Sequence, residues 1–207
     1  LTGVEFSESG QIRLNKPAYD HVFDIVARFA PLAFRRPVAS PELEAYASLA
    51  KPVLAADRPF LEAVRVSLRA ILSAPSFLYQ SGDSGALDEF GLATRLSYFL
   101  WRSLPDTELF DLAHEGRLSD PAVLTRQVNR MLDDPKSERF VKDFSGQAFR
   151  LYEIYATTPD PGLYPEYDGR LGVSMVQETE LFLNELIAEN LGIMNLVDSD
   201  FTFANRR

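Results

Sequence analysis

Hydrophobic positions recur with the spacing of α-helices along most of the chain. The clearest case is the stretch 88–109, where four apolar residues fall at i, i+4, i+7 and i+8: Leu92, Leu96, Phe99 and Leu100. The residue before a proline is pushed out of the α region, so we expect this helix to end at Leu104, before Pro105. A short second helix is predicted to begin at Pro105, with Gly116 just beyond its end.

Further helices are predicted from the same spacing and from their start signals. A serine or aspartate followed by proline marks a helix start, because the side-chain oxygen caps the first turn and proline is tolerated there. The predicted helices begin near Pro17, Ser40, Asp57, Ser119, Asp134 and Leu171. The last one is long and ends near Leu191, before Gly192. No segment is predicted as a strand. The fold class is therefore all-α, with antiparallel helices joined by short proline-containing corners.

Polar and glycine-containing stretches divide these helices into two helical subdomains. The sequence SGDSG in the middle of the chain is the most linker-like stretch. We predict an arm or linker over 1–16, a smaller helical domain over 17–80, a linker over 81–87, a larger helical domain over 88–198 and the start of a following element over 199–207. The chain is therefore expected to be a piece of a longer protein.

The composition supports packed helices and argues against several partners. Hydrophobic residues make up 46% of the 207 positions, which is enough for a substantial core. The net charge of −9 would repel a phosphate backbone, so no nucleic acid is expected as a partner. No apolar run approaches the roughly 18 residues that a membrane span needs, and none is predicted. Without cysteine, this chain has no disulfide, no thiolate nucleophile and no Cys-x-x-Cys-His attachment for haem c.

One candidate binding surface lies on the helix that holds the single tryptophan. Its residues are Arg95, Tyr98, Trp101 and Arg102, whose side chains offer bidentate hydrogen bonds and stacking area. In the alternative interpretation, Trp101 belongs to the core and the two arginines bind helix C-termini or acids of neighbouring helices. The alternative is the commoner arrangement for a large aromatic side chain.

A second candidate binding surface is the long loop 157–169, which is rich in proline, tyrosine and acid. Tyr164, Glu166 and Asp168 in this loop are candidates for binding a cation or lining a cleft, since long loops often carry function. Their spacing does not match a calcium loop of the EF-hand type.

Acidic and histidine side chains on the helices are the remaining candidates for chemistry. Glu178 and Glu185 lie a heptad apart on the last long helix and form a candidate acid/base pair, although a solvated acidic face is the commoner explanation. Asp111 and His114 lie three residues apart, but no further ligand and no His-Glu-x-x-His motif accompanies them. No metal site is therefore predicted. His21 has no patterned partner.

Four segments of the chain together resemble a known family. They read LAFRRPVASPELEAYASLA, SLRAILSAPSFLYQ, LATRLSYFLWRSLPDTELFDLAHEGRLSDPAVLTRQVNRMLDDPKSERFVKDFSGQAFRL and YPEYDGRLGVSMVQETELFLNELI. Residues 29–79 resemble the smaller, and residues 92–197 the larger, of two consecutive helical domains of unknown function (PSD-type domains). Such domains occur in large secreted, cytochrome-associated proteins of planctomycetes and related bacteria. One departure is Gln147-Ala148-Phe149, where relatives tend to have tryptophan and leucine after the glutamine.

The resemblance implies a location and a context. It implies that the chain is periplasmic or secreted, and that haem c is carried in another part of the parent protein, with no cofactor in this chain. It transfers no catalytic residue. The favoured hypothesis is a non-catalytic helical module that binds other domains of the same polypeptide or a protein partner. The alternative hypothesis is an enzyme domain, either a carboxylate-dependent hydrolase or part of an extracellular oxidoreductase.

Overall fold

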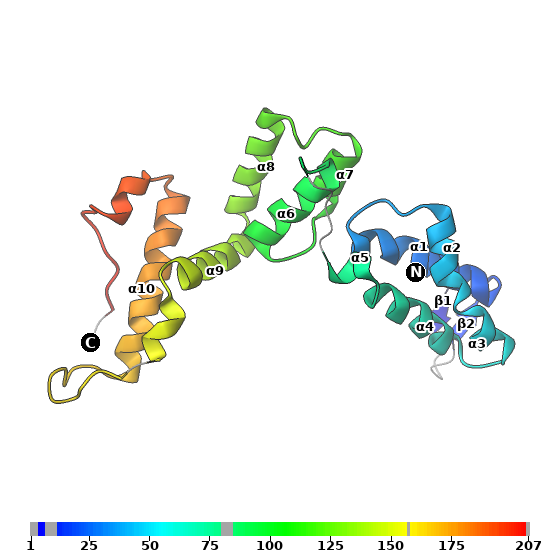
Figure 1. Ribbon diagram of the computed structural model, residues 1–207, viewed down its shortest axis with the longest axis horizontal. Helices are drawn as coiled ribbons and strands as arrows, with labels where there is room; N and C mark the ends of the chain where they lie inside the picture. Colours follow the sequence, from blue (N-terminus) through cyan, green and yellow to red (C-terminus); the bar gives the residue numbers. More distant parts are fainter. Residues whose placement is uncertain (1–3, 7–11, 80–84, 157, 206–207) are drawn as a thin grey trace. The chain divides into compact units, whose positions relative to one another are not determined.

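The computed structural model describes residues 4–6, 12–79, 85–156 and 158–205 (Figure 1). The chain divides into two compact units, residues 1–91 and residues 92–207. The first unit contains β1 (Val4–Phe6), β2 (Ile12–Leu14), α1 (Ala18–Phe34), α2 (Ser40–Ser48), α3 (Lys51–Ala55), α4 (Phe60–Leu72) and α5 (Pro75–Leu78). Apart from the two short strands, the regular elements described in this unit are helices, in agreement with the all-α prediction.

The second unit contains α-helices and short 3₁₀ turns. Its α-helices are α6 (Glu89–Trp101), which starts just before the division, α7 (Thr107–His114), α8 (Pro121–Asp133), α9 (Glu138–Ala148) and α10 (Gly169–Ala188). The 3₁₀ turns are η1 (Pro135–Ser137), η2 (Leu151–Tyr155) and η3 (Ile193–Leu196). The all-α fold class is confirmed. Of the helices that the structure describes, none is long and apolar enough to span a lipid bilayer.

Two short strands in the N-terminal segment depart from the all-helical prediction. β1 and β2 pair as an antiparallel ribbon, with Glu5 opposite Arg13. The sequence prediction assigned this segment to an arm and found no strand. Strands of three residues stabilise each other by pairing, and so short a run gives almost no periodicity from which a strand can be recognised.

The core of the first unit lies between α1, α2 and α4. α1 contributes Val22, Val26 and Ala30, which are completely buried, and Ala47 and Ala63 meet them from α2 and α4. These small residues allow close approach of the helices. Pro31 lies inside α1, and the helix continues past it to Phe34. It ends where Arg35 adopts a left-handed conformation with φ of 57°.

The buried Arg35 side chain connects two helix ends in the first unit. Its Nη2 atom donates hydrogen bonds to the carbonyl oxygens of Ser76 at 3.0 Å and of Phe77 at 3.1 Å. Both carbonyls belong to α5, and the last carbonyls of a helix have no partner within the helix. The guanidinium group therefore fixes the end of α1 against α5.

Helix ends in the second unit differ from the predicted ones in two places. α6 ends at Trp101 rather than at Leu104, because Arg102 takes a left-handed conformation with φ of 51°. α10 ends at Ala188 rather than near Leu191, and the left-handed residue after it is Asn190 and not Gly192. Asparagine tolerates this conformation better than most residues that carry a Cβ atom. Gly116 has a φ of 65° just beyond α7, as expected.

We expect Arg35→Met to lower the free energy of unfolding by about 2–3 kcal/mol, because charge-assisted hydrogen bonds to the carbonyls of Ser76, Phe77 and Tyr79 are lost. Arg69→Met on the exposed face of α4 is the matched control, with an expected change within about 0.5 kcal/mol. Urea denaturation of both variants measures the difference. Equal stability of the two variants would contradict a linking role for Arg35.

Candidate functional site

Trp101 lies in the core of the second unit, where it joins α6 to α8. The side chain is 1% exposed, and its Nε1 atom donates a hydrogen bond to the carbonyl oxygen of Met131 at 2.9 Å. Met131 is in the last turn of α8, where carbonyl groups have no partner within the helix. Two cations approach the indole: Lys136 Nζ is 4.2 Å, and Arg130 Cζ 5.4 Å, from the ring centroid. Trp101 is therefore a packing and hydrogen-bonding element.

Arg130 is the centre of a polar network beside this indole. Its Nη1 and Nη2 atoms donate to the two carboxylate oxygens of Asp106, at 2.8 and 3.3 Å. Its Nε atom donates to Oε1 of Gln127 at 2.8 Å, and the Gln127 amide in turn donates to Glu108 at 2.7 Å. The network connects the start of α7 to α8.

Asp106 has two structural tasks in this network. Its Oδ1 atom also accepts a hydrogen bond from the backbone N–H of Leu109 at 3.0 Å, which makes it the N-cap of α7. Partial burial by itself raises the pKa of this carboxyl, but the hydrogen bonds from Arg130 and from Leu109 outweigh burial, and the pKa lies below its ordinary value. The carboxylate is thus held ionised by partners that shape the fold.

The structure does not bring the four residues of the first candidate surface together. Trp101 is buried, Tyr98 is half-buried, and Arg95 and Arg102 are exposed. Arg102 Nη1 contacts Asp143 Oδ1 in α9 at 2.9 Å, an ion pair with a neighbouring helix. The indole is therefore not available to a ligand at the surface, which corrects its place among the candidate binding residues.

The second candidate surface has mixed roles. Tyr164 and Glu166 are exposed, as expected for a binding loop. Asp168 caps α10, accepting a hydrogen bond from the backbone N–H of Leu171 at 2.7 Å. The aspartate therefore positions the helix start, while the tyrosine remains accessible.

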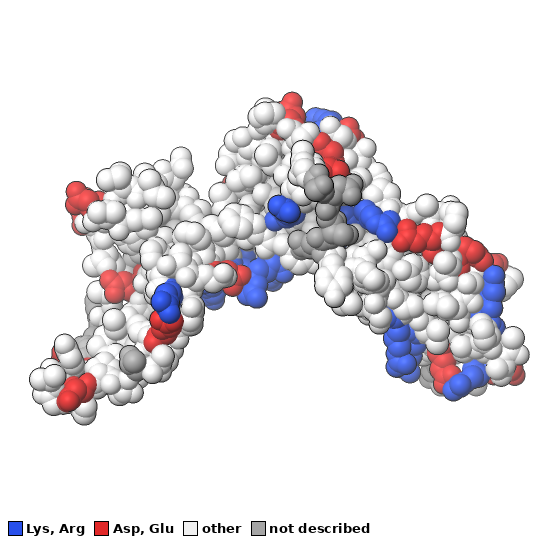
Figure 2. All heavy atoms as spheres, viewed as in Figure 1, with Lys and Arg blue, Asp and Glu red and all other residues white. Residues whose placement is uncertain are grey.

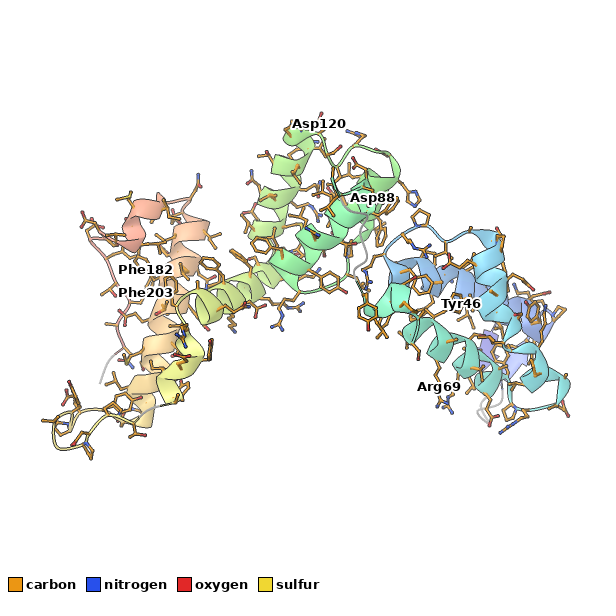
Figure 3. All side chains as sticks on the ribbon, viewed as in Figure 1. Tyr46, Arg69, Asp88, Asp120, Phe182 and Phe203 are labelled. Atoms are coloured by element: carbon orange, nitrogen blue, oxygen red, sulfur yellow. The ribbon has the colours of Figure 1, made fainter. Side chains whose placement is uncertain are left out.

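The two candidate acid/base glutamates are separated along α10. Seven residues of α-helix span about 10.5 Å, and paired carboxylates in glycoside hydrolysis lie closer together, at roughly 5–9.5 Å. Glu178 is exposed and accepts a hydrogen bond from Thr202 Oγ1 at 2.6 Å, whereas Glu185 is half-buried. The segment after η3 lies along this helix, with Phe201 stacked on Phe182 at a centroid distance of 5.0 Å. Phe201 also contacts Phe203 at a centroid distance of 6.2 Å, and Figure 3 labels Phe182 of α10 and Phe203 of this segment.

The remaining titratable candidates do not form a cluster. Asp111 and His114 are both exposed on α7. Among the residues that the structure describes, no group of three or more His, Asp or Glu side chains is placed to hold a metal ion. His21 is buried against the ring of Phe60 at a centroid distance of 6.3 Å, and its Nε2 atom has no hydrogen-bond partner in the described part of the chain.

One surface was missed by sequence reasoning. Phe99 was placed on the buried face of its helix, but the side chain is 63% exposed and contacts Phe140 of α9. Phe140 in turn contacts Phe144, which contacts Phe149. We call these four residues the aromatic ladder. The spacing of Phe140 and Phe144 was the only local signal, since Phe99 joins them through the packing of two helices.

These features define a helical protein in which Asp106 and Asp168 cap helices, and Arg130 and Trp101 connect them. A family model described as PSD4, "Protein of unknown function (DUF1592)", matches residues 87–207, and the chain belongs to this family. A second family model, PSD5, "Protein of unknown function (DUF1595)", matches residues 22–81. No curated protein and no solved structure matches the chain significantly.

We expect Asp106→Asn to lower the free energy of unfolding at pH 7 by about 1 kcal/mol, since asparagine still caps α7 but loses the ion pair with Arg130. The folded-state pKa of Asp106 is depressed, so its contribution is present above the unfolded pKa of about 4 and is lost as pH falls through the folded pKa. The variant should therefore lose stability less steeply below about pH 4.

Urea denaturation between pH 7 and pH 2.5 measures this difference. Asp111→Asn, at an exposed position of α7, is the control and should follow the unsubstituted chain. Parallel pH profiles for Asp106→Asn and the unsubstituted chain would contradict the assignment.

Proposed function

We propose that this chain is a non-catalytic helical module of a larger exported protein that carries haem c in another domain. The module binds other domains of the same polypeptide or a protein partner, in the periplasm or outside the cell. The observation that carries the proposal is the use of carboxylates in the second unit: Asp106, Asp120 and Asp168 each cap a helix by accepting backbone N–H groups.

The arrangement of the other candidate residues supports the same proposal. Trp101 donates to a backbone carbonyl, and Arg102 pairs with an acid of the next helix. Glu178 holds the segment that follows η3 through Thr202. Side chains that are engaged with the fold in this way position helices. Membership of a family described only as of unknown function is compatible with this role.

The exported and haem-linked part of the proposal rests on the resemblance to PSD-type domains. The chain has no cysteine, so a covalently attached haem c requires a Cys-x-x-Cys-His segment in another part of the parent protein. The module would then hold a redox domain and its neighbours in place without contributing a ligand to the iron.

We expect the absorption spectrum of the native full-length parent protein to show sharp c-type haem bands after reduction with dithionite. The unreduced protein in the same buffer is the reference. Bands on the same polypeptide after denaturing gel separation and haem staining support covalent attachment. A featureless spectrum would overturn the haem-linked part of the proposal.

We expect Glu178→Gln and Glu185→Gln to leave any hydrolytic or redox activity of the parent protein unchanged within about twofold, because neither carboxylate is proposed to act as an acid or base. Glu189→Gln, at an exposed position after α10, is the matched control. General acid/base catalysis contributes about 100-fold or more to a reaction rate. The contrary result is therefore about a 100-fold loss of activity in the folded Glu178 or Glu185 variant, while the control keeps its activity. Such a loss would favour an enzyme domain instead.

A further inference from the structure

The aromatic ladder is an exposed apolar surface that joins α6 to α9. Centroid distances along it are 5.0 Å from Phe99 to Phe140, 5.6 Å from Phe140 to Phe144 and 6.3 Å from Phe144 to Phe149. Phe99, Phe144 and Phe149 are 63, 43 and 46% exposed. Contiguous exposed aromatic surface of this kind marks interaction sites. Phenylalanine has no polar atom in its side chain, so the surface suits apolar side chains of a protein.

Arginines lie beside the α6 end of this ladder. Arg95 lies one helical turn before Phe99 and therefore on the same side of α6, whereas Lys142, two residues from both Phe140 and Phe144, lies on the opposite side of α9. Arg139 is held beside the end of α6 by its hydrogen bond to the carbonyl oxygen of Trp101 at 2.9 Å. Figure 2 shows Lys and Arg side chains gathered where α6 and α9 meet. Among the described residues, neither Arg95 nor Arg139 forms an ion pair with a carboxylate.

A second exposed apolar surface of the same unit lies in and just after η3, where the nearby charged residues are acidic rather than basic. Ile193 and Met194 in η3 and Val197 just after it are 77, 69 and 85% exposed. We call these three residues the apolar knob. Residues 171–205, which contain the knob, include six carboxylates and no Lys or Arg: Glu178, Glu180, Glu185, Glu189, Asp198 and Asp200. The knob is therefore an apolar projection with acidic residues on both sides of it in the sequence.

We propose that the apolar knob of one copy of this chain docks on the aromatic ladder of a second copy. Apolar burial between Phe side chains and the knob supplies the attraction, and the arginines beside the ladder face the acids beside the knob. The two surfaces are different, so the contact is head to tail, and repetition of the contact gives a ring or a filament. This inference rests on the proposed function, because it names a second copy as one partner of the interaction module.

A charge-swap experiment on the 207-residue chain tests the proposal by sedimentation velocity over a concentration series. The unsubstituted chain should associate. In one variant, Arg95→Glu replaces the cation beside Phe99 with a carboxylate. In the other, Glu189→Lys with Asp198→Lys makes the surroundings of the knob basic. Each variant alone should raise the apparent dissociation constant at least about tenfold, since like charges then face each other. An equimolar mixture should associate again, because each ladder meets a knob of opposite charge.

Matched controls separate this contact from effects of net charge and of unfolding. Arg69→Glu changes the net charge by the same amount as Arg95→Glu at an exposed position of α4, and Figure 3 shows Arg69 directed away from the neighbouring helices. This control should associate like the unsubstituted chain. Val197→Ser removes an apolar contact without changing charge and should also weaken association at least about tenfold. Circular dichroism and Trp101 emission check that each variant is folded.

Several outcomes would overturn the inference. They are a monomer at all concentrations, a mixture of the two variants that does not associate, or an α4 control that loses association as strongly as the ladder variant. A monomeric chain leaves the proposed function standing, with other domains as the partners, because the haem spectrum and the glutamate variants test that function independently. Loss of the haem bands would leave the self-association result unaffected.

Discussion

Satisfaction of helix-end carbonyls by side-chain donors is the constraint on which much of this structure depends. A helix leaves its last carbonyl groups without partners, and burial of an unpaired carbonyl is costly. Trp101 donates to Met131 at the end of α8, and Arg139 donates to the carbonyl of Trp101 at the end of α6. In the first unit, Arg35 does the same for α5. Each of these bonds joins one helix to the end of another, so the donors connect the helices while they complete the hydrogen bonding.

The carboxylates perform the complementary task at helix starts. Asp106, Asp120 and Asp168 accept from backbone N–H groups in the first turns of α7, α8 and α10. Asp106 also binds Arg130, so the N-cap of α7 and the packing beside Trp101 depend on one ionised group. A side chain that holds several partners in a fixed geometry stabilises the fold, but it is poorly suited to exchange protons with a substrate. The electrostatics of the second unit therefore favour a structural role for its acids.

The second unit also has exposed apolar side chains, which do not contribute to its core. The aromatic ladder and the apolar knob are both exposed in the second unit, and they differ in the charge around them. Burial of such surface in an interface is favourable, and the charges around it select the partner and the orientation. This distribution of side chains supports the proposed role in binding proteins.

The sequence by itself determined the helical class, most helix starts and several caps, because these depend on local patterns. Asp120 before Pro121 and Gly116 after α7 have the positions that the pattern predicted. Helix ends were less predictable, because Arg102 and Asn190 adopt the left-handed conformation although neither is a glycine, the residue by which such an end is usually recognised. Their conformations follow from how the chain packs after each helix.

Only the tertiary structure decided which aromatic residues are buried. Trp101 and Phe99 lie two residues apart on one predicted helix, yet Trp101 is buried against α8 while Phe99 extends into the aromatic ladder with α9. The same local pattern allowed either residue to face the core. The helical period determines which side chains share a face, but the burial of that face depends on the helices that pack against it.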